Sequence, residues 1–178
     1  MTESKAHEEL VNEIKKTISP HFSFLLIEDE NAIGKIQIFD EKVLRERKQN
    51  RFKIAEADIM VLDDKENPFL VIEPETSSSP KTFGRSIPVY AVAQSVKVGN
   101  KKYLIESPLL LLVVIPKQKN DSQKDKQLPD LERKLKETID FGRSNLRDFA
   151  FCQISDLRPT LKWLFESNGY DKYACYFG

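Results

Sequence analysis

A chain of 178 residues is long enough to enclose one sizeable core, and 40% hydrophobic with 31% charged residues is an ordinary composition for a soluble globular domain. No apolar run approaches the ~20 residues of a membrane-spanning helix, and the polar, acidic start of the chain predicts neither a secretory signal nor an Arg-rich transit peptide. The chain has 28 basic and 28 acidic residues, so its net charge gives no argument for nucleic-acid binding.

The chain contains two cysteines, Cys152 and Cys175, which we predict to be free thiols of a reducing compartment rather than a disulfide. We therefore expect a single domain over residues 1–178, located in the cytoplasm.

The N-terminal part of the chain predicts a helix, a strand and two less regular stretches. Apolar residues three and four positions apart predict a helix over residues 5–18. The apolar run of residues 22–27 predicts a strand, whereas residues 32–39 fit a strand and a helix equally well. Residues 40–49 predict a helix with Asp40 as its N-cap.

Residues 54–76 predict a β-hairpin. Two apolar runs, residues 59–62 and 69–72, predict the strands, and the polar residues 63–68 between them predict a short turn. Acidic side chains flank both strands at the end of the hairpin away from the turn: Glu56, Asp58, Glu73 and Glu75.

The stretch after the hairpin predicts a helix and three strands. Residues 80–96 predict a loop followed by a helix with Pro88 in its first turn, where the missing N–H of proline is harmless. Residues 96–98 and 103–105 predict two short strands around a turn. The continuous apolar run of residues 109–115 predicts a central strand that is buried on both faces.

The C-terminal part begins with residues 117–129, which lack apolar periodicity and predict a mobile loop. The regular elements predicted after it are a helix over residues 130–147 capped by Asp130, a strand over residues 149–154 and a helix over residues 156–167. The aromatic residues 170–177 predict an edge strand or a dimer surface.

Three acids of the hairpin are expected to converge. In an antiparallel pair the start of one strand lies beside the end of the other, so Asp58 can meet Glu73. Residues two apart share a face of a strand, so Glu75 points the same way as Glu73. Crowded carboxylates must take up a proton or share a cation, and an oxygen-only cluster suits Mg²⁺. The alternative is a solvated hairpin whose acids never meet.

The spacing of these acids resembles the PD-(D/E)XK nuclease superfamily, which has the restriction-endonuclease-like fold. After Asp58 come fourteen residues and then Glu73-Pro74-Glu75, at the end of a Phe-Leu-Val-Ile strand. Ala57 stands where the family often has proline, and Glu75 stands where it usually has the lysine thought to activate water. A branch of type II restriction enzymes also has Glu-x-Glu here, and the chain is similar to that branch.

The resemblance implies an α/β fold with a mixed central β-sheet flanked by helices, and the activity of a Mg²⁺-dependent DNA endonuclease. In that activity Asp58 and Glu73 ligate Mg²⁺, and Glu75 ligates it or orients the attacking water. The family often adds an acid from a helix before the hairpin, a place that Glu41 fits, although a plain surface acid is the alternative. A palindromic target in double-stranded DNA implies two such sites and hence a homodimer.

Basic and polar residues on both sides of the hairpin are candidates for DNA contacts. Residues 42–53 carry six basic side chains against one acid, and residues 76–81 predict a small polar loop. Groups of both kinds bind phosphates in protein–DNA complexes, and their alternative role is a solvated surface. The candidates are Arg45, Lys48, Arg51, Ser78, Lys81 and Arg85.

Other polar residues give weaker signals. Tyr90 and Gln94 would share a face of the helix after the hairpin, and some relatives use a glutamine of this helix near the metal, although a surface amide is the alternative. Neither His7 nor His21 has a partner at catalytic or metal-binding spacing.

Two other functions stay open at this point. A non-catalytic DNA-binding or scaffold protein that keeps the nuclease fold would fit the zero net charge and the glutamate at position 75. An RNA-directed or repair nuclease would use the same metal chemistry.

Overall fold

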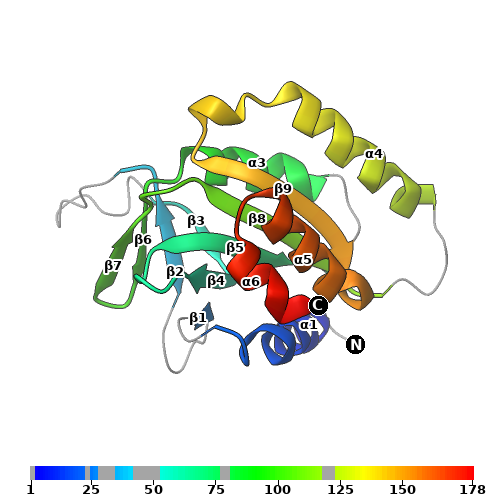
Figure 1. Ribbon diagram of the computed structural model, residues 1–178, viewed down its shortest axis with the longest axis horizontal. Coiled ribbons are helices and arrows are strands. Elements are labelled where there is room, and N and C mark those ends of the chain that lie inside the picture. The colour runs from blue at the N-terminus through cyan, green and yellow to red at the C-terminus, as the bar shows by residue number, and fades with distance from the viewer. Residues whose placement is uncertain (1–2, 23–24, 28–34, 42–52, 77–80, 118–122) are drawn as a thin grey trace.

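The computed structural model describes residues 3–22, 25–27, 35–41, 53–76, 81–117 and 123–178. These residues form a mixed α/β fold with two β-sheets and helices packed around them (Figure 1). The expected α/β class is therefore confirmed. The expected central sheet is accompanied by a second, smaller sheet that the sequence pattern does not predict. Among the described residues, no helix is both long and apolar enough to cross a membrane.

The larger sheet has five strands in the order β1-β4-β5-β8-β9. Its strands are β1 (Leu25–Ile27), β4 (Ile59–Leu62), β5 (Pro68–Pro74), β8 (Leu109–Ile115) and β9 (Leu146–Gln153). The pairs β1–β4 and β4–β5 are antiparallel, and the pairs β5–β8 and β8–β9 are parallel. The sheet is therefore mixed, as expected.

Strands β4 and β5 form the predicted hairpin, and Asp63 organises its turn. One oxygen of the Asp63 carboxylate accepts hydrogen bonds from the backbone N–H groups of Lys65 and Asn67, both at 2.8 Å. An aspartate side chain that accepts backbone hydrogen bonds in this way stabilises the turn. The register pairs Ile59 with Ile72, so the residues that flank these two positions are neighbours at the open end of the hairpin.

The smaller sheet has four antiparallel strands in the order β3-β2-β6-β7. Its strands are β2 (Ile36–Phe39), β3 (Lys53–Ala57), β6 (Ser95–Val98) and β7 (Lys101–Leu104). Of the ambiguous residues 32–39, positions 36–39 form strand β2, and residues 32–34 lie outside the described residues. Residue 58 alone separates β3 from β4, so the chain passes from the smaller sheet to the larger one at Asp58.

The larger sheet buries both of its faces. Helices α1 (Glu3–Ile18), α5 (Leu157–Ser167) and α6 (Asp171–Ala174) supply the apolar side chains packed on one face. Helices α3 (Lys81–Val92) and α4 (Gln123–Thr138), together with the smaller sheet, supply those on the other. Strand β8 alternates between the two clusters and every residue in it is buried, which confirms the prediction for residues 109–115.

Helix α3 begins and ends earlier than predicted. It covers Lys81–Val92 with Pro88 in its interior, and residues 95–98 form strand β6. The early end has a tertiary cause: the carbonyl of Ala91 accepts from the backbone N–H of Asn145 at 2.8 Å, and that of Ala93 accepts from the Asn145 amide at 2.7 Å. Long-range partners for the last carbonyls of a helix are invisible to a local pattern.

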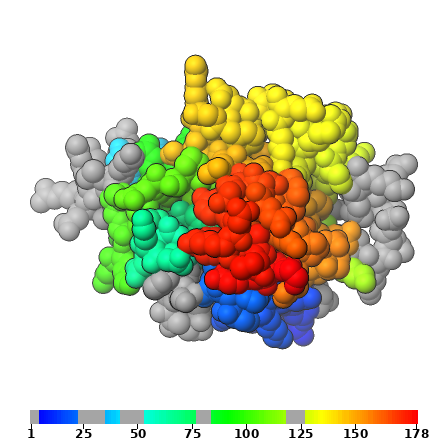
Figure 2. Space-filling view, in the orientation of Figure 1, coloured from blue at the N-terminus to red at the C-terminus, as the bar shows by residue number. Residues whose placement is uncertain are grey.

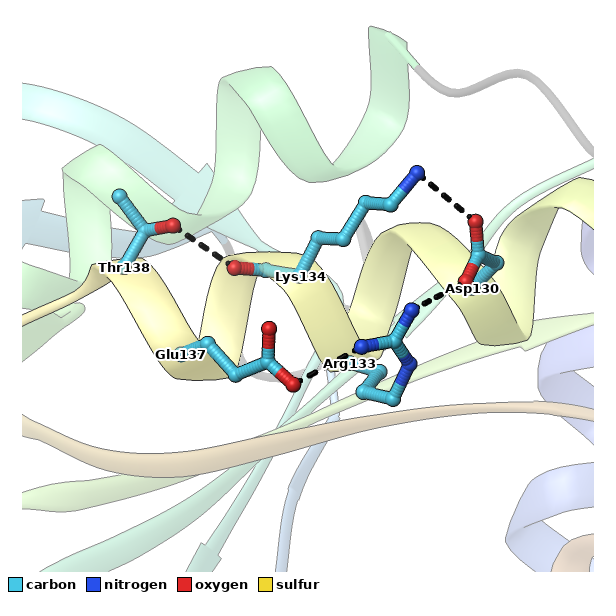
Figure 3. A network of polar contacts seen from close by, with 5 residues as sticks. All are labelled: Asp130, Arg133, Lys134, Glu137 and Thr138. Atoms are coloured by element: carbon cyan, nitrogen blue, oxygen red, sulfur yellow. Dashed lines mark hydrogen bonds and ion pairs between the residues drawn. The ribbon is translucent and has the colours of Figure 1, made fainter.

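Helix α4 also differs from the prediction at both ends. It begins at Gln123 within the expected loop and carries Pro129 in its interior, so Asp130 is not its N-cap. Asp130 instead pairs with Arg133 (2.7 Å) and Lys134 (2.9 Å), and Arg133 also pairs with Glu137 (Figure 3). These pairs lie one helical turn apart, the spacing that supports an exposed helix. The helix ends at Thr138, and residues 141–143 form a 3-10 turn in which the Asp140 carboxylate accepts from the backbone N–H of Gly142 at 3.1 Å.

The end of the chain is helical, so the edge strand predicted over residues 170–177 is wrong. Helix α6 and the 3-10 turn Cys175–Phe177 fold back onto α5 and α1 (Figure 2). Their aromatic side chains join an internal cluster, in which Phe165 lies 5.9 Å from Tyr173 and 6.0 Å from Phe177 between ring centroids. Tyr173 and Phe177 of this segment thus serve the packing of the core rather than a strand.

Both cysteines are free, as predicted. Cys152 is buried in β9, and desolvation raises the pKa of its thiol to about 12. The thiolate is the reactive form, so Cys152 behaves as a packing residue.

We predict that Gly169→Ala destabilises the chain by about 1–2 kcal/mol, the cost of a left-handed conformation for an L-residue. Gly169 ends α5 with φ 77°, while the N–H of Tyr170 donates to the Phe165 carbonyl at 2.9 Å. No atom lies within 4 Å of an added Cβ, so the cost is conformational rather than steric. Gly84→Ala is the matched control: Gly84 is exposed within α3, where alanine should raise the free energy of unfolding by roughly 1 kcal/mol. Urea unfolding measures the free energy of unfolding of both variants, and a change of the same sign in the two would contradict the prediction.

Candidate active site

Asp58 and Glu73 lie side by side where the hairpin opens. Because Ile59 pairs with Ile72, Asp58 just before β4 and Glu73 in β5 are neighbours. Asp58 is close enough to raise the pKa of Glu73, both through its negative charge and as a side-chain hydrogen-bonding neighbour. The meeting of these two acids, expected from strand geometry, is thus present in the structure.

The carboxyl group of Glu73 is enclosed by protein, although the residue as a whole is only partly buried. Burial raises the pKa of Glu73 well above its ordinary value, and the neighbouring negative charges of Asp58 and Glu75 raise it further. A hydrogen bond from the Tyr90 hydroxyl to Oε1 of Glu73 opposes this shift. In the absence of a cation the site therefore favours the protonated form of Glu73.

Glu75 follows β5 and continues its pairing with β8. Its backbone N–H donates to the carbonyl of Val114 at 2.8 Å. Its negative charge raises the pKa of Glu73. Among the described residues, however, Asp58, Glu73 and Glu75 do not form a group arranged to hold a metal ion.

Two residues at the site come from helices that the sequence does not connect to the hairpin. Tyr90 lies on α3 and is 2% exposed, and its own pKa is raised well above 10 by burial and then by Glu73. His7 lies on α1 with Nε2 3.5 Å from Oδ2 of Asp58. His7 therefore has a partner, Asp58, that spacing along the sequence does not reveal. Its helical spacing to Leu10 and Ile14, both buried, is the signal that could have placed it on the inner face.

Glu56 is paired with lysines, and Glu41 is held through its backbone carbonyl. The Glu56 carboxylate pairs with Lys35 at 2.6 Å and with Lys53 at 2.9 Å, and these hydrogen bonds lower its pKa. Glu41 follows β2 in irregular backbone, and its carbonyl accepts from the Ser95 hydroxyl at 2.6 Å. The helix predicted over residues 40–49 is therefore not seen at its first two residues, and the rest of it lies outside the described residues.

The predicted DNA contacts are only partly placed. Arg45, Lys48, Arg51 and Ser78 lie outside the described residues. Lys81 is the first residue of α3, and Arg85 is exposed on the same helix. Gln94 lies beyond the end of α3, where its backbone bonds to Phe39 and Ile105 rather than presenting a helix face.

The described residues contain no group of three histidines, cysteines or acids already arranged to hold a metal ion. Asp58 and Glu73 supply two neighbouring carboxyl groups, and a third ligand would require a side-chain rearrangement or a residue outside the described ranges. Compared with protein-family models, with curated proteins and with solved structures, the chain matches none of them.

Proposed function

We propose that the chain is a Mg²⁺-dependent DNA endonuclease, similar to the Glu-x-Glu branch of the PD-(D/E)XK type II restriction enzymes. The observation that carries the proposal is the adjacency of Asp58 and Glu73 at the open end of the hairpin, where Asp58 and Glu75 both raise the pKa of Glu73. A helix, α3, packs behind this pair through Tyr90, at the place where the family has a helix. The mixed sheet with helices on both faces agrees with the same resemblance.

The donor set fits a hard divalent cation. All three acids supply oxygen ligands, which Mg²⁺ prefers. The strongest influences on Glu73 besides burial are Tyr90, Asp58 and Glu75, none of which is cationic. A buried carboxyl beside like charges is relieved by a cation as well as by a proton. Bound Mg²⁺ supplies charge stabilisation at a phosphodiester and lowers the pKa of water.

The chain's own residues then divide the work. Asp58 and Glu73 hold the ion, and Glu75, in the place of the usual lysine, accepts a hydrogen bond from the attacking water and orients it. Arg45, Lys48 and Arg51, together with the group Ser78, Lys81 and Arg85, bind the phosphates of double-stranded DNA. A homodimer places two such sites on a palindromic target.

Asp58→Asn tests the proposal. With supercoiled plasmid and Mg²⁺, the unsubstituted chain should cut the DNA, and the Asp58→Asn variant should lose at least about a hundredfold in rate, because a transition-state interaction of a few kcal/mol is removed. Asp64→Asn is the matched control, since Asp64 is an exposed acid at the turn of the same hairpin, paired with Lys172 at 2.6 Å. Equal rates in all three proteins would assign the cleavage to a contaminant.

A second candidate is a DNA-binding or scaffold protein that keeps the fold without cutting. Two observations favour it: the described residues hold no ready three-ligand metal group, and a glutamate occupies the position of the motif lysine. Calorimetric titration of the chain with Mn²⁺ and Mg²⁺ separates the two candidates. DNA binding with neither metal binding nor cleavage would support the scaffold, and metal binding that depends on Asp58 would support the nuclease.

A further inference from the structure

We infer that Tyr90 is the positioning residue of the metal site: its hydroxyl fixes the rotation of the Glu73 carboxyl group and thereby the direction in which Glu73 offers its oxygens. This inference rests on the proposed function, because Glu73 is a ligand only if the site holds a metal. It assigns a role to a side chain of α3 that the acidic motif of the hairpin does not contain.

The geometry supports a positioning role. The Tyr90 hydroxyl donates to Oε1 of Glu73, and the strand register places Asp58 beside Glu73 on the neighbouring strand. The last torsion of a glutamate side chain has a broad energy minimum, so the carboxyl plane is set by its neighbours rather than by the chain. A donor on one oxygen and a carboxyl partner together determine that plane.

Tyr90 is itself held firmly. It is 2% exposed and belongs to the apolar cluster between the larger sheet and α3, near Val71 of β5 and Val113 of β8. Asn145, just before β9, binds the carbonyls of Ala91 and Ala93 and so fixes the end of α3 immediately after Tyr90. A hydroxyl on a rigid support can orient a ligand, whereas a mobile one cannot.

Packing alone does not account for tyrosine at this position. A phenylalanine would fill the same space in the cluster, and the hydroxyl adds a buried polar atom that needs a partner. The partner it has is the one acid of the candidate site whose carboxyl is enclosed by protein. Groups that orient metal ligands affect metal affinity or activity by about 10–100-fold when they are removed.

Tyr90→Phe tests the inference, because it removes the hydroxyl and keeps the ring. We expect the dissociation constant for Mn²⁺, measured by calorimetric titration without DNA, to rise at least about tenfold. The Mg²⁺ concentration that gives half-maximal cleavage should rise in parallel, while the KM for DNA stays unchanged. Tyr103→Phe is the matched control, since Tyr103 packs at the edge of the same cluster on β7.

The outcomes separate the two levels of the proposal. If the unsubstituted chain binds no Mn²⁺, the metal site fails and the role of Tyr90 fails with it. If the unsubstituted chain binds Mn²⁺ and cuts DNA while Tyr90→Phe binds and cuts equally well, the positioning role alone is overturned. If Tyr90→Phe lowers the melting temperature, titration at 10 °C keeps the variant folded, and an unchanged dissociation constant there would also overturn the role.

Discussion

Replacing Glu73 with glutamine should abolish cleavage and at the same time raise the melting temperature of the metal-free chain at neutral and alkaline pH. The glutamine carbonyl can accept the hydrogen bond of the Tyr90 hydroxyl, and its amide can donate to Asp58, so the contacts of the protonated glutamate are kept. The variant cannot ionise, and it therefore avoids the repulsion from Asp58 and Glu75 that burial makes expensive.

The pH dependence has a definite sign. The pKa of Glu73 is raised in the folded chain by burial first and by Asp58 and Glu75 next, whereas in the unfolded chain it has its ordinary value. The folded state therefore binds the proton more tightly, and its contribution to stability is complete below the unfolded pKa. That contribution is lost as the pH rises through the folded pKa. The advantage of Glu73→Gln should thus be small near pH 4 and grow with pH.

Differential scanning calorimetry from pH 4 to 9 in the presence of a chelator measures the effect. For a chain of this size a gain of 1 kcal/mol corresponds to a rise of ~2–4 °C in Tm, and a rise of at least this size is expected at pH 8. Glu106→Gln, at an exposed acid, is the control and should change nothing. A Glu73→Gln variant that melts below the unsubstituted chain at every pH would show that the carboxyl group is ionised and stabilising. Added Mg²⁺ should stabilise the unsubstituted chain and the Glu106→Gln control, but not Glu73→Gln.

Phe165→Ala should destabilise the chain by about 3–5 kcal/mol, the usual cost of removing a fully buried aromatic ring. Phe165 lies on α5 with no exposed surface, and its ring is within 6.4 Å of five others between centroids. These five rings belong to Phe22, Phe69, Tyr170, Tyr173 and Phe177. The substitution therefore loosens α1, the hairpin and the C-terminal segment together.

Urea unfolding followed by tyrosine and tryptophan fluorescence measures the loss. Trp163→Ala is the matched control on the same helix, because the Trp163 ring is 46% exposed and lies beside the Lys136 ammonium, 4.6 Å from its centroid. A loss of about 1 kcal/mol or less is expected for this contact. Similar losses in the two variants would mean that the C-terminal residues do not pack against the core in solution.

The parts of the fold that could be predicted from the sequence are those fixed by local pattern. The run of residues 109–115 has no polar position, so it can only be a strand buried on both faces, and β8 is that strand. Asp63 and Pro68 mark the hairpin turn because their side chains favour it locally. The sequence pattern places the start of helix α4 too late, because a proline such as Pro129 is typical of a helix start, although this helix continues through it.

The candidate site divides in the same way. The adjacency of Asp58 and Glu73 follows from the register of one hairpin, which sequence reasoning can reach. Tyr90 and His7 come from helices on either side of the larger sheet, and their approach to the acids depends on how these helices pack. Packing of distant segments leaves no trace in the spacing of a single motif.

The position of Asp58 between two sheets has a consequence for how the pair of acids can be adjusted. Glu73 belongs to β5, which pairs with β4 on one side and with β8 on the other. Asp58 is the single residue that joins the larger sheet to β3, the end strand of the smaller one. A small tilt of one sheet relative to the other would therefore change the separation of the two carboxyl groups while both sheets stay intact. We expect substitutions in β2, β6 or β7 to alter the distance between the acids without touching either of them.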